Sequence, residues 1–347
     1  MKITLRSLSF LSILFAAGCA ETTAPLPPAE EVLLVVNSTE ATLSVIPTGA
    51  PNLAVKVPLG GTSPTPVGVA ARGTVALVPL GSDNAVAVLN LRAGSVTQII
   101  PLPGNSGATG VGIVNDSIAY VANPNINTVT RVNYLSGDTA SVAVGIFPQG
   151  VIAARGKVFV MNGNLVNFTP AGESWISVID PVTNQLAAGI DSIPLPGPGN
   201  AGYVVEGTDG LLYVMSSGDF VNEGRLSIVD PVARTEVASF GGFGAGPGQM
   251  AMGPDDRLFI SSFAEGLMEF DILARSVTRG AGDGVSIPGN SSVAVDSRGR
   301  IYAISTGGCQ AGVPGIAHVL REDLTESEAL TLGECAIGTA ISSIPPD

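Results

Sequence analysis

The stretch Ala119-Tyr120-Val121-Ala122-Asn123 is one of seven short apolar runs that recur along this chain of 347 residues. The runs are LLVVN (33–37), ALVPL (76–80), AYVAN (119–123), VFVMN (158–162), LYVMS (212–216), LFISS (258–262) and IYAIS (301–305). Their last residues are 43, 43, 39, 54, 46 and 43 positions apart. A repeat of this length that occurs seven times predicts an all-β fold, a seven-bladed β-propeller.

The segments between these runs supply the remaining strands of each blade. A further strand follows every run, and five of these strands end on Asn or Asp, whose side chains favour tight turns. These five residues are Asn90, Asn133, Asp180, Asp230 and Asp271. A short outer strand, a Gly/Pro loop and a strand of small residues then lead into the next run. Small residues suit strands that crowd around one axis, so we predict four antiparallel strands per blade.

The two ends of the repeat are incomplete in complementary ways. The first blade begins at 33–37 without an inner strand before it, whereas 335–342 is an inner strand without a blade after it. We therefore expect the C-terminal strand to join the N-terminal blade as its innermost strand, with residues 33–59 outside it. Such closure removes a free sheet edge.

Composition excludes several classes of protein. The 44 Gly and 25 Pro residues argue against a mostly helical fold. A mean hydropathy of +0.42 with only 5% aromatic residues indicates many short buried strands rather than membrane helices. The 16 basic and 29 acidic residues give a net charge of −13, which argues against nucleic-acid binding.

The N-terminus has the pattern of an export signal. Lys2 and Arg6 precede an apolar stretch, 8–18, that is too short to span a bilayer. The sequence Phe15-Ala16-Ala17-Gly18-Cys19 resembles the bacterial lipobox, although Ala16 stands where that motif most often has Leu. The resemblance implies a signal peptide (1–18) and lipidation of Cys19. The Pro-rich composition that follows predicts a tether (19–30), and the repeat predicts a propeller (31–347). Ala20, rather than Asp, implies the outer membrane; the alternative is an ordinary secreted protein with an incidental Cys19.

Two cysteines remain in the exported part of the chain, Cys309 and Cys335. Oxidising conditions favour a disulfide between them. The phase of the repeat places both in loops on the same face of the last blade, which agrees with that pairing. Two separate buried thiols or a metal site are the alternatives, and a single His with no CxxC makes a metal site the weaker one.

Parts of the repeat resemble known propeller families. The stretch 119–123, with Asn133 and the loop 145–150, resembles the YVTN repeat. The stretches 240–262 and 292–305 are similar to the related NHL repeat. The resemblance covers about residues 31–344 and implies the propeller fold. Because these families include enzymes, sensors and adhesion modules, it does not imply one activity.

No residue pattern indicates a catalytic or metal centre. The one histidine, His318, lies within a predicted strand, and most carboxylates lie in outer turns. Calcium prefers oxygen ligands, and the nearest approaches to a calcium loop are 123–127 and 218–223. Neither segment reproduces a known calcium-binding loop, and ordinary turns are the stronger interpretation, so we expect no cofactor, with calcium as the alternative.

The longer loops point to a binding face. The loops around 162–175, 216–225 and 305–315 are predicted on one face, together with 145–149, 194–201 and 240–248. They bring six aromatic residues to or near one rim, and rigid aromatic side chains suit a ligand or partner site. The six are Phe147, Phe168, Trp175, Phe220, Phe243 and Phe263. The alternative is that each fills a gap beneath its loop.

The sequence thus favours an exported, lipid-anchored, monomeric propeller of the cell envelope that binds a protein, glycan or small molecule without catalysis. One alternative is a metal-dependent hydrolase or lyase of the gluconolactonase-like propeller type. Another is a structural or assembly subunit of the cell envelope.

Overall fold

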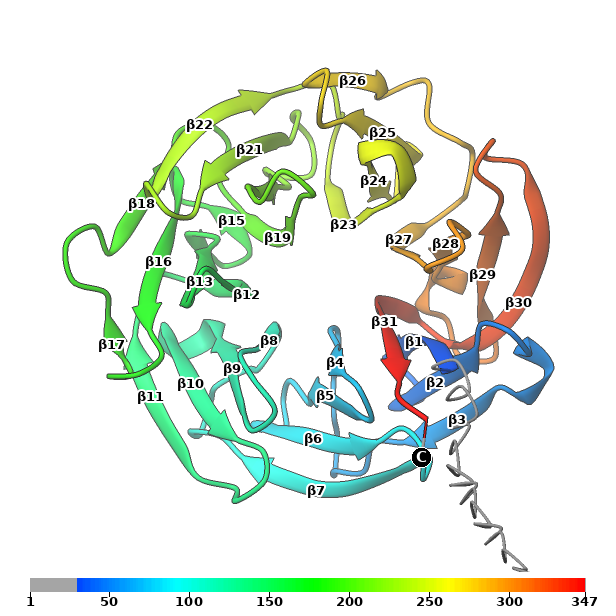
Figure 1. The fold of residues 1–347 in the computed structure, drawn as a ribbon, viewed down its shortest axis with the longest axis horizontal. Coiled ribbons are helices and arrows are strands. Elements are labelled where there is room, and N and C mark those ends of the chain that lie inside the picture. Colours follow the sequence, from blue (N-terminus) through cyan, green and yellow to red (C-terminus); the bar gives the residue numbers. More distant parts are fainter. Residues whose placement is uncertain (1–29, 347) are drawn as a thin grey trace, which may run out of the picture.

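The computed structural model describes residues 30–346, which form seven blades around a central axis (Figure 1). Six blades contain four main strands each. In five of them the strands follow one another in chain order from the axis outward, and in the first blade the C-terminal strand takes the innermost place. Blade one consists of β31 (Ala336–Ile344), β1 (Glu30–Asn37), β2 (Thr42–Pro47) and β3 (Val55–Pro58). Blade two consists of β4 (Ala70–Arg72), β5 (Val75–Pro79), β6 (Ala85–Asn90) and β7 (Ser95–Pro101). Blade three consists of β8 (Val111–Ile113), β9 (Ile118–Asn123), β10 (Thr128–Asn133) and β11 (Thr139–Ala143).

The last three blades have the same order. They are β19 (Ala201–Glu206), β20 (Leu212–Ser216), β21 (Arg225–Asp230), β22 (Thr235–Phe240); β23 (Pro247–Met252), β24 (Arg257–Ser262), β25 (Gly266–Asp271), β26 (Ser276–Arg279); and β27 (Asn290–Val295), β28 (Ile301–Ser305), β29 (Pro314–Leu320), β30 (Glu326–Glu334). The predicted repeat is therefore confirmed.

Blade four departs from the common pattern. Its outer edge is split between two short strands that both pair with β16, and a separate hairpin rises from the loop before β16. Its strands are β12 (Pro148–Ala154), β13 (Lys157–Asn162), β16 (Ser174–Asp180), β17 (Gln185–Leu186) and β18 (Ser192–Leu195), and the hairpin is β14 (Leu165–Val166) with β15 (Thr169–Pro170). Part of the segment that the sequence predicts as a loop is thus ordered as a hairpin.

Helical structure in residues 30–346 is confined to four short 3₁₀ turns: η1 (Pro51–Leu53), η2 (Pro124–Ile126), η3 (Pro254–Asp256) and η4 (Gly307–Cys309). Over that same range, no helix has the length and apolar character needed to cross a bilayer.

Small residues allow the inner strands to approach one another closely. A Cβ atom added to Gly110 would lie 1.8 Å from the carbonyl oxygen of Gln149 in the neighbouring blade. At Gly150 the added atom would lie 2.5 Å from the carbonyl oxygen of Gly202. Side chains are therefore excluded where consecutive blades meet at the axis, as the sequence predicts.

The hydrophobic core is divided among the junctions between blades. Seven clusters of buried residues each combine side chains from two neighbouring blades, and together they cover every junction of the ring. Between blades three and four, for example, Tyr120 and Val129 pack with Val158 and Val160. Each blade therefore depends on both of its neighbours for burial of its apolar faces.

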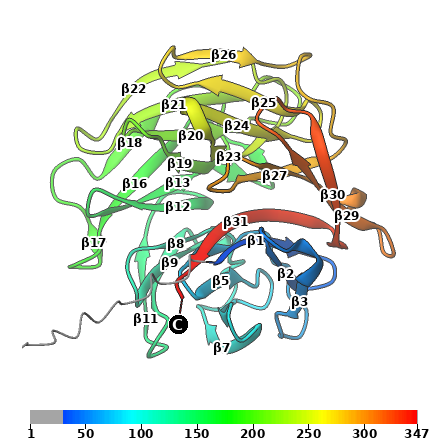
Figure 2. The same ribbon diagram turned by 45° about the vertical axis from the view of Figure 1, so that its right-hand side comes forward.

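The C-terminal strand closes the ring as predicted. β31 pairs antiparallel with β1 from Glu30 opposite Ile344 to Asn37 opposite Ala336, so the first blade combines both chain ends (Figure 2). On the next blade, the carbonyl oxygen of Gly73 accepts a 2.9 Å hydrogen bond from the Ser342 hydroxyl.

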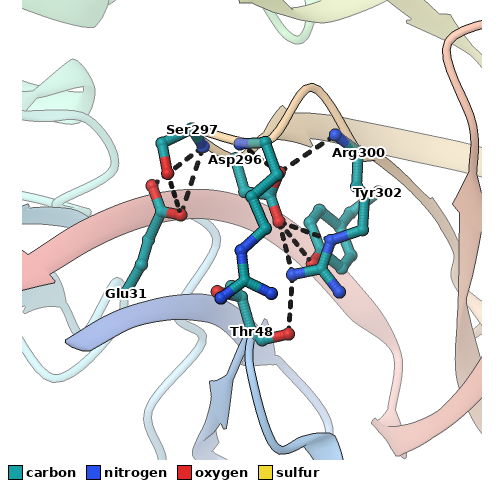
Figure 3. Close-up of polar contacts among 7 residues, drawn as sticks. Glu31, Thr48, Asp296, Ser297, Arg300 and Tyr302 are labelled. Atoms are coloured by element: carbon teal, nitrogen blue, oxygen red, sulfur yellow. Dashed lines mark hydrogen bonds and ion pairs between the residues drawn. The ribbon is translucent and has the colours of Figure 1, made fainter. Parts of the chain in front are cut away.

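Polar contacts reinforce the junction of blades seven and one (Figure 3). The buried Asp296 carboxylate accepts hydrogen bonds from the Arg300 guanidinium at 2.6 and 2.7 Å and from the Tyr302 hydroxyl at 3.0 Å. Arg300 also donates to the Thr48 carbonyl oxygen at 2.6 Å, and Glu31 accepts from Ser297. Burial and the nearby Asp296 charge raise the pKa of Tyr302. The tyrosine is therefore held as a neutral hydrogen-bond donor.

The disulfide between Cys309 and Cys335 is present. Cys309 lies in η4 between β28 and β29, and Cys335 lies between β30 and β31. The bond therefore links blade seven to the start of the closing strand.

The blades give the ring two different faces. One face, here called the long-loop face, carries the loops 59–69, 163–173, 217–224 and 306–313. The opposite, short-loop face carries the tight turns between first and second strands and between third and outer strands. Because β1 runs from the short-loop face to the long-loop face, Glu30 lies at the short-loop face.

Candidate ligand-binding site at the long-loop face

A cavity of about 420 Å³ opens at the centre of the ring on the long-loop face. Its wall comes from the first residues of the inner strands of all seven blades and from Phe263 in the loop after β24. Among residues 30–346, no charged residue and no histidine lines it. The volume falls in the range of small-molecule sites.

Three polar groups at the cavity wall have hydrogen-bonding capacity that residues 30–346 leave unused. Gln149 donates to the Asn200 side-chain oxygen at 2.8 Å, but its own Oε1 accepts no hydrogen bond within that range. The Tyr203 hydroxyl has no partner among the described residues. The buried Thr109 Oγ1 likewise has none. The Gln149 and Tyr203 groups are available to a polar, uncharged ligand, whereas Thr109 Oγ1 is enclosed by the protein.

Tyr203 projects from β19 into the cavity. Its side chain is 40% exposed because the cavity is open to solvent. Enclosure by the surrounding blades still removes much of the bulk water and raises the pKa of its phenol above the ordinary value of 10. The hydroxyl is therefore protonated at neutral pH, when it both donates and accepts a hydrogen bond.

Other polar side chains make the wall rigid. The Gln249 amide donates to the Thr339 carbonyl oxygen at 2.8 Å and accepts from the Thr339 backbone N–H at 3.1 Å. This pair joins blade six to the closing strand across blade seven. The Ser291 hydroxyl donates to the Ala336 carbonyl oxygen at 3.0 Å. These contacts fix the strands that shape the cavity.

The six aromatic residues that the sequence singles out have different environments. Phe168, Phe220 and Phe263 are 75%, 61% and 60% exposed, and they lie in long-loop-face loops of three consecutive blades. Phe147 is half-buried, and its ring meets that of Phe168 edge to face at 5.8 Å. Of these residues only Phe263 lines the cavity itself.

The other two aromatic residues serve packing. Trp175 is the second residue of β16 and is half-buried, with its ring over Gly145, where an added Cβ would lie 2.5 Å from the indole. Phe243 is 0% exposed and belongs to the core between blades five and six. Phe243 therefore offers no surface to a ligand.

Three of the phenylalanines have left-handed backbone conformations. The φ angles are +54° for Phe147, +62° for Phe168 and +63° for Phe220. Such φ angles are rare for bulky residues because the Cβ atom approaches the following carbonyl oxygen. Unfavourable backbone conformations concentrate at functional sites.

In the two segments considered for calcium, Asn127 and Asp219 use side-chain oxygen atoms within the protein, while the buried Asn123 Oδ1 has no partner among the described residues. Asn127 Oδ1 accepts the Phe147 N–H at 3.0 Å. The Asp219 carboxylate accepts N–H groups of Asn222 and Val221, and these bonds lower its pKa. Within residues 30–346, no group of three or more His, Cys, Asp or Glu side chains is placed to hold a metal ion. His318 lies on β29 beside Glu326, at 3.3 Å, and does not line the cavity.

Sequence reasoning missed Gln149, Tyr203, Gln249 and Thr109. Gln149, Tyr203 and Gln249 are the second or third residues of inner strands, and Thr109 lies two residues before β8; the repeat otherwise has small or apolar residues at this level. Two glutamines at that register, in QGVIAAR (149–155) and QMAMGPD (249–255), could have indicated polar side chains at the axis. Polar residues at the crowded axis have no structural reason to be there unless they bond to one another or to a ligand.

Comparison with known proteins identifies the fold. No protein-family model matches the chain, and no curated protein matches it. Among solved structures, the Kuenenia stuttgartiensis hydrazine synthase is similar with a TM-score of 0.62 and 13% identity over 79% of this chain and 89% of that one. A streptogramin B lyase is similar with a TM-score of 0.63 and 10% identity over 81% of this chain and 92% of that one. At such low identity the likeness shows that this chain shares the seven-bladed β-propeller fold with these proteins.

Proposed function

We propose that the protein is a binding module whose central cavity takes an uncharged, hydroxyl-bearing small molecule such as a neutral mono- or disaccharide. The observation that carries the proposal is the grouping of Gln149 Oε1 and the Tyr203 hydroxyl in one cavity, to whose wall residues 30–346 contribute no charged side chain. Neutral donors and acceptors match hydroxyl groups. An anionic ligand would find no cation there.

The aromatic side chains also favour the long-loop face as the binding face. Phe263 at the cavity wall offers an apolar ring to the C–H face of a sugar, and Phe168 and Phe220 stand on neighbouring loops. The left-handed conformations of Phe168 and Phe220 cost backbone stability, which argues for a role outside packing.

The test is a thermal-shift and calorimetric screen that pairs neutral sugars with their uronic acids. We expect a neutral sugar to raise the Tm, and we expect its charged counterpart to have no effect. Tyr203→Phe and Gln149→Ala should weaken binding, whereas Trp175→Phe, which alters a half-buried residue on β16, should not.

Two results would contradict this function. One is preferential binding of the uronic acids. The other is stoichiometric calcium in the purified protein together with chelator-sensitive turnover in a lactonase and esterase panel, which would favour the metal-dependent hydrolase. Capture of a protein by the exposed aromatic loops, lost on Phe168→Ala together with Trp175→Ala, would assign the face to a protein partner instead.

We further propose that the protein is exported and lipid-anchored at Cys19, in the outer membrane, with repeats of the YVTN and NHL types. Cys19 lies outside the described residues. The Cys309–Cys335 disulfide supports an oxidising compartment. Glu30 lies at the short-loop face, so a tether that leaves there keeps the cavity mouth open.

Intact-mass measurement of the native protein tests the anchor. We expect a mass that corresponds to a chain starting at an acylated Cys19 and recovery in the outer-membrane fraction. A native protein that is unmodified and freely secreted would refute the anchor and leave the cavity proposal standing.

A further inference from the structure

The short-loop face carries a recurrent feature that the cavity does not explain. In five of the seven blades, the segment between the third and outer strands exposes one aliphatic side chain, with exposed fractions from 62% to 91%. These residues, here called the aliphatic rim, are Leu53, Leu135, Val182, Val232 and Leu273.

Packing does not require these side chains. In two of the turns the residue just before the rim residue is the one that packs: Tyr134 is 4% and Ile272 is 2% exposed. Leu135 and Leu273, which follow them, are 70% and 73% exposed. These two turns therefore already contain their buried apolar residue, and the exposed one is additional.

The backbone N–H groups of three rim residues are hydrogen-bonded within their own turns. The N–H of Leu135 donates to Asn133 Oδ1 at 3.0 Å, that of Val182 to Asp180 Oδ1 at 2.9 Å, and that of Val232 to Asp230 Oδ1 at 2.7 Å. Because these N–H groups are bonded within the turn, the tip loses no water hydrogen bonds there when it is buried.

The spacing of the rim favours a lipid surface over a protein. A protein interface needs a contiguous apolar centre, whereas the rim residues stand on separate blades with polar turn residues between them. A bilayer surface accepts separate apolar tips, since each enters individually while its polar neighbours stay among the headgroups.

The described part of the chain begins at the same face. Glu30 begins β1 at the short-loop face, and the segment from Cys19 to Glu30 spans at most about 40 Å even when fully extended. An acyl chain on Cys19 would thus hold this face within that distance of the bilayer.

We infer that the aliphatic rim rests on the surface of the bilayer that carries the lipid anchor. The inference depends on the proposed anchor and is independent of the cavity. The rim gives the tethered propeller a second point of attachment and directs the cavity away from the membrane.

The test uses the full acylated chain in phosphatidylcholine vesicles with brominated acyl chains, which quench tryptophan on contact. Two reporters in a Trp175→Phe background are compared: Val232→Trp on the rim and Val221→Trp, a matched control at a position that is 80% exposed on the long-loop face. We expect several-fold stronger quenching of the rim reporter. Serine at the other four rim positions should reduce that quenching, and an unchanged Tm would show that the fold is intact.

Equal quenching of the two reporters in vesicles that carry the acylated protein would contradict the contact between the rim and the bilayer and would leave the proposed anchor standing. A rim that binds a protein would also leave the Val232→Trp reporter unquenched and would count against the inference. A chain that lacks acylation and does not float with vesicles would overturn anchor and rim together. The sugar screen on the same variants reports the cavity separately.

Discussion

The phenylalanines of the long-loop face are unusual in their backbone as well as in their exposure. Phe220 has a φ of +63° and is 61% exposed, so it lacks both a favourable backbone region and a buried environment. Glycine or asparagine normally occupies such positions because the steric cost is lower. The Phe220 ring lies against Gly246, where an added Cβ would be 2.9 Å from Cδ1, so the cost is offset either by this contact or by an interaction outside the folded chain.

Phe220→Asn should therefore leave the protein as stable or raise the free energy of unfolding by up to about 1 kcal/mol, because asparagine tolerates the left-handed region. Denaturant unfolding measures the effect. The neighbouring Val221→Asn is the control, since Val221 is exposed without a left-handed φ and should show no gain. A clear loss of stability in Phe220→Asn would mean that the ring packs on the domain.

Glu269 gives the stability a pH dependence. Burial acts to raise its pKa, but hydrogen bonds from Arg257 at 2.6 Å and Thr278 at 2.9 Å outweigh burial and lower the pKa below 4.5. A lowered pKa in the folded state contributes stability above the unfolded value, and this contribution is lost as pH falls through the folded pKa.

The difference in Tm between the wild type and Glu269→Gln should accordingly be largest at neutral pH and shrink below pH 4.5. Thermal melts across this range measure it. Glu328→Gln, at an exposed position on β30, should stay close to the wild type throughout. If the difference in Tm between the wild type and Glu269→Gln does not change with pH, the ionised Glu269–Arg257 pair is not its cause.

Individual site residues could be predicted only in part. The exposed loop positions of Phe168, Phe220 and Phe263 could be predicted because these residues stand between recognisable strands, whereas their part in binding stays a prediction. The prediction that Phe243 belongs to the binding rim is wrong. Its glycine-rich neighbours predict a loop, yet its ring is buried between blades five and six. Gln149 and Tyr203 were missed because the repeat predicts which strand a residue occupies, not which residues from seven blades meet at one level of the axis.

At the scale of elements, period and strand phase predicted nearly all of the fold. The pairing of β31 with β1 follows from counting strands, since one end of the repeat lacks an inner strand and the other has one to spare. The hairpin β14–β15 could not be predicted in this way. Its strands have two residues each, too few to show an alternating pattern.

The disulfide should stabilise the closing element measurably. It encloses a segment with a sequence separation of 26 residues, for which the chain-entropy model gives about 3 kcal/mol. Cys309→Ser combined with Cys335→Ser should lower the free energy of unfolding by about that amount, and reductant should affect the wild type alone. Recovery of both cysteines as free thiols from the exported protein would contradict the link.

The whole molecule is a ring in which no blade is terminal. Seven junction clusters and the β31–β1 pairing give every blade two packed neighbours. An open array of repeats frays from its ends, whereas a closed ring has none. The closing strand should therefore control the stability of blades far from it.

Trp175, the only tryptophan, reports on this coupling from blade four, across the ring from the closing strand (Figure 1). In the intact chain its fluorescence and the far-UV circular dichroism should change in one coincident transition, which is the mark of cooperative unfolding. Deletion of 336–347 removes β31, so we expect a lower midpoint and two separated transitions, with the blades beside the gap unfolding before blade four.

A milder variant covers the case in which the truncated chain fails to fold. Gly338 in β31 has a φ of +63°, and an added Cβ would lie 2.4 Å from the Val67 carbonyl oxygen, so Gly338→Val should weaken closure without removing the strand. Gly94, which also has a positive φ but no neighbour within 4 Å, provides the matched control Gly94→Val, which carries the backbone strain alone. If Gly338→Val lowers the midpoint no more than Gly94→Val and its two probes still coincide, closure does not govern the ring.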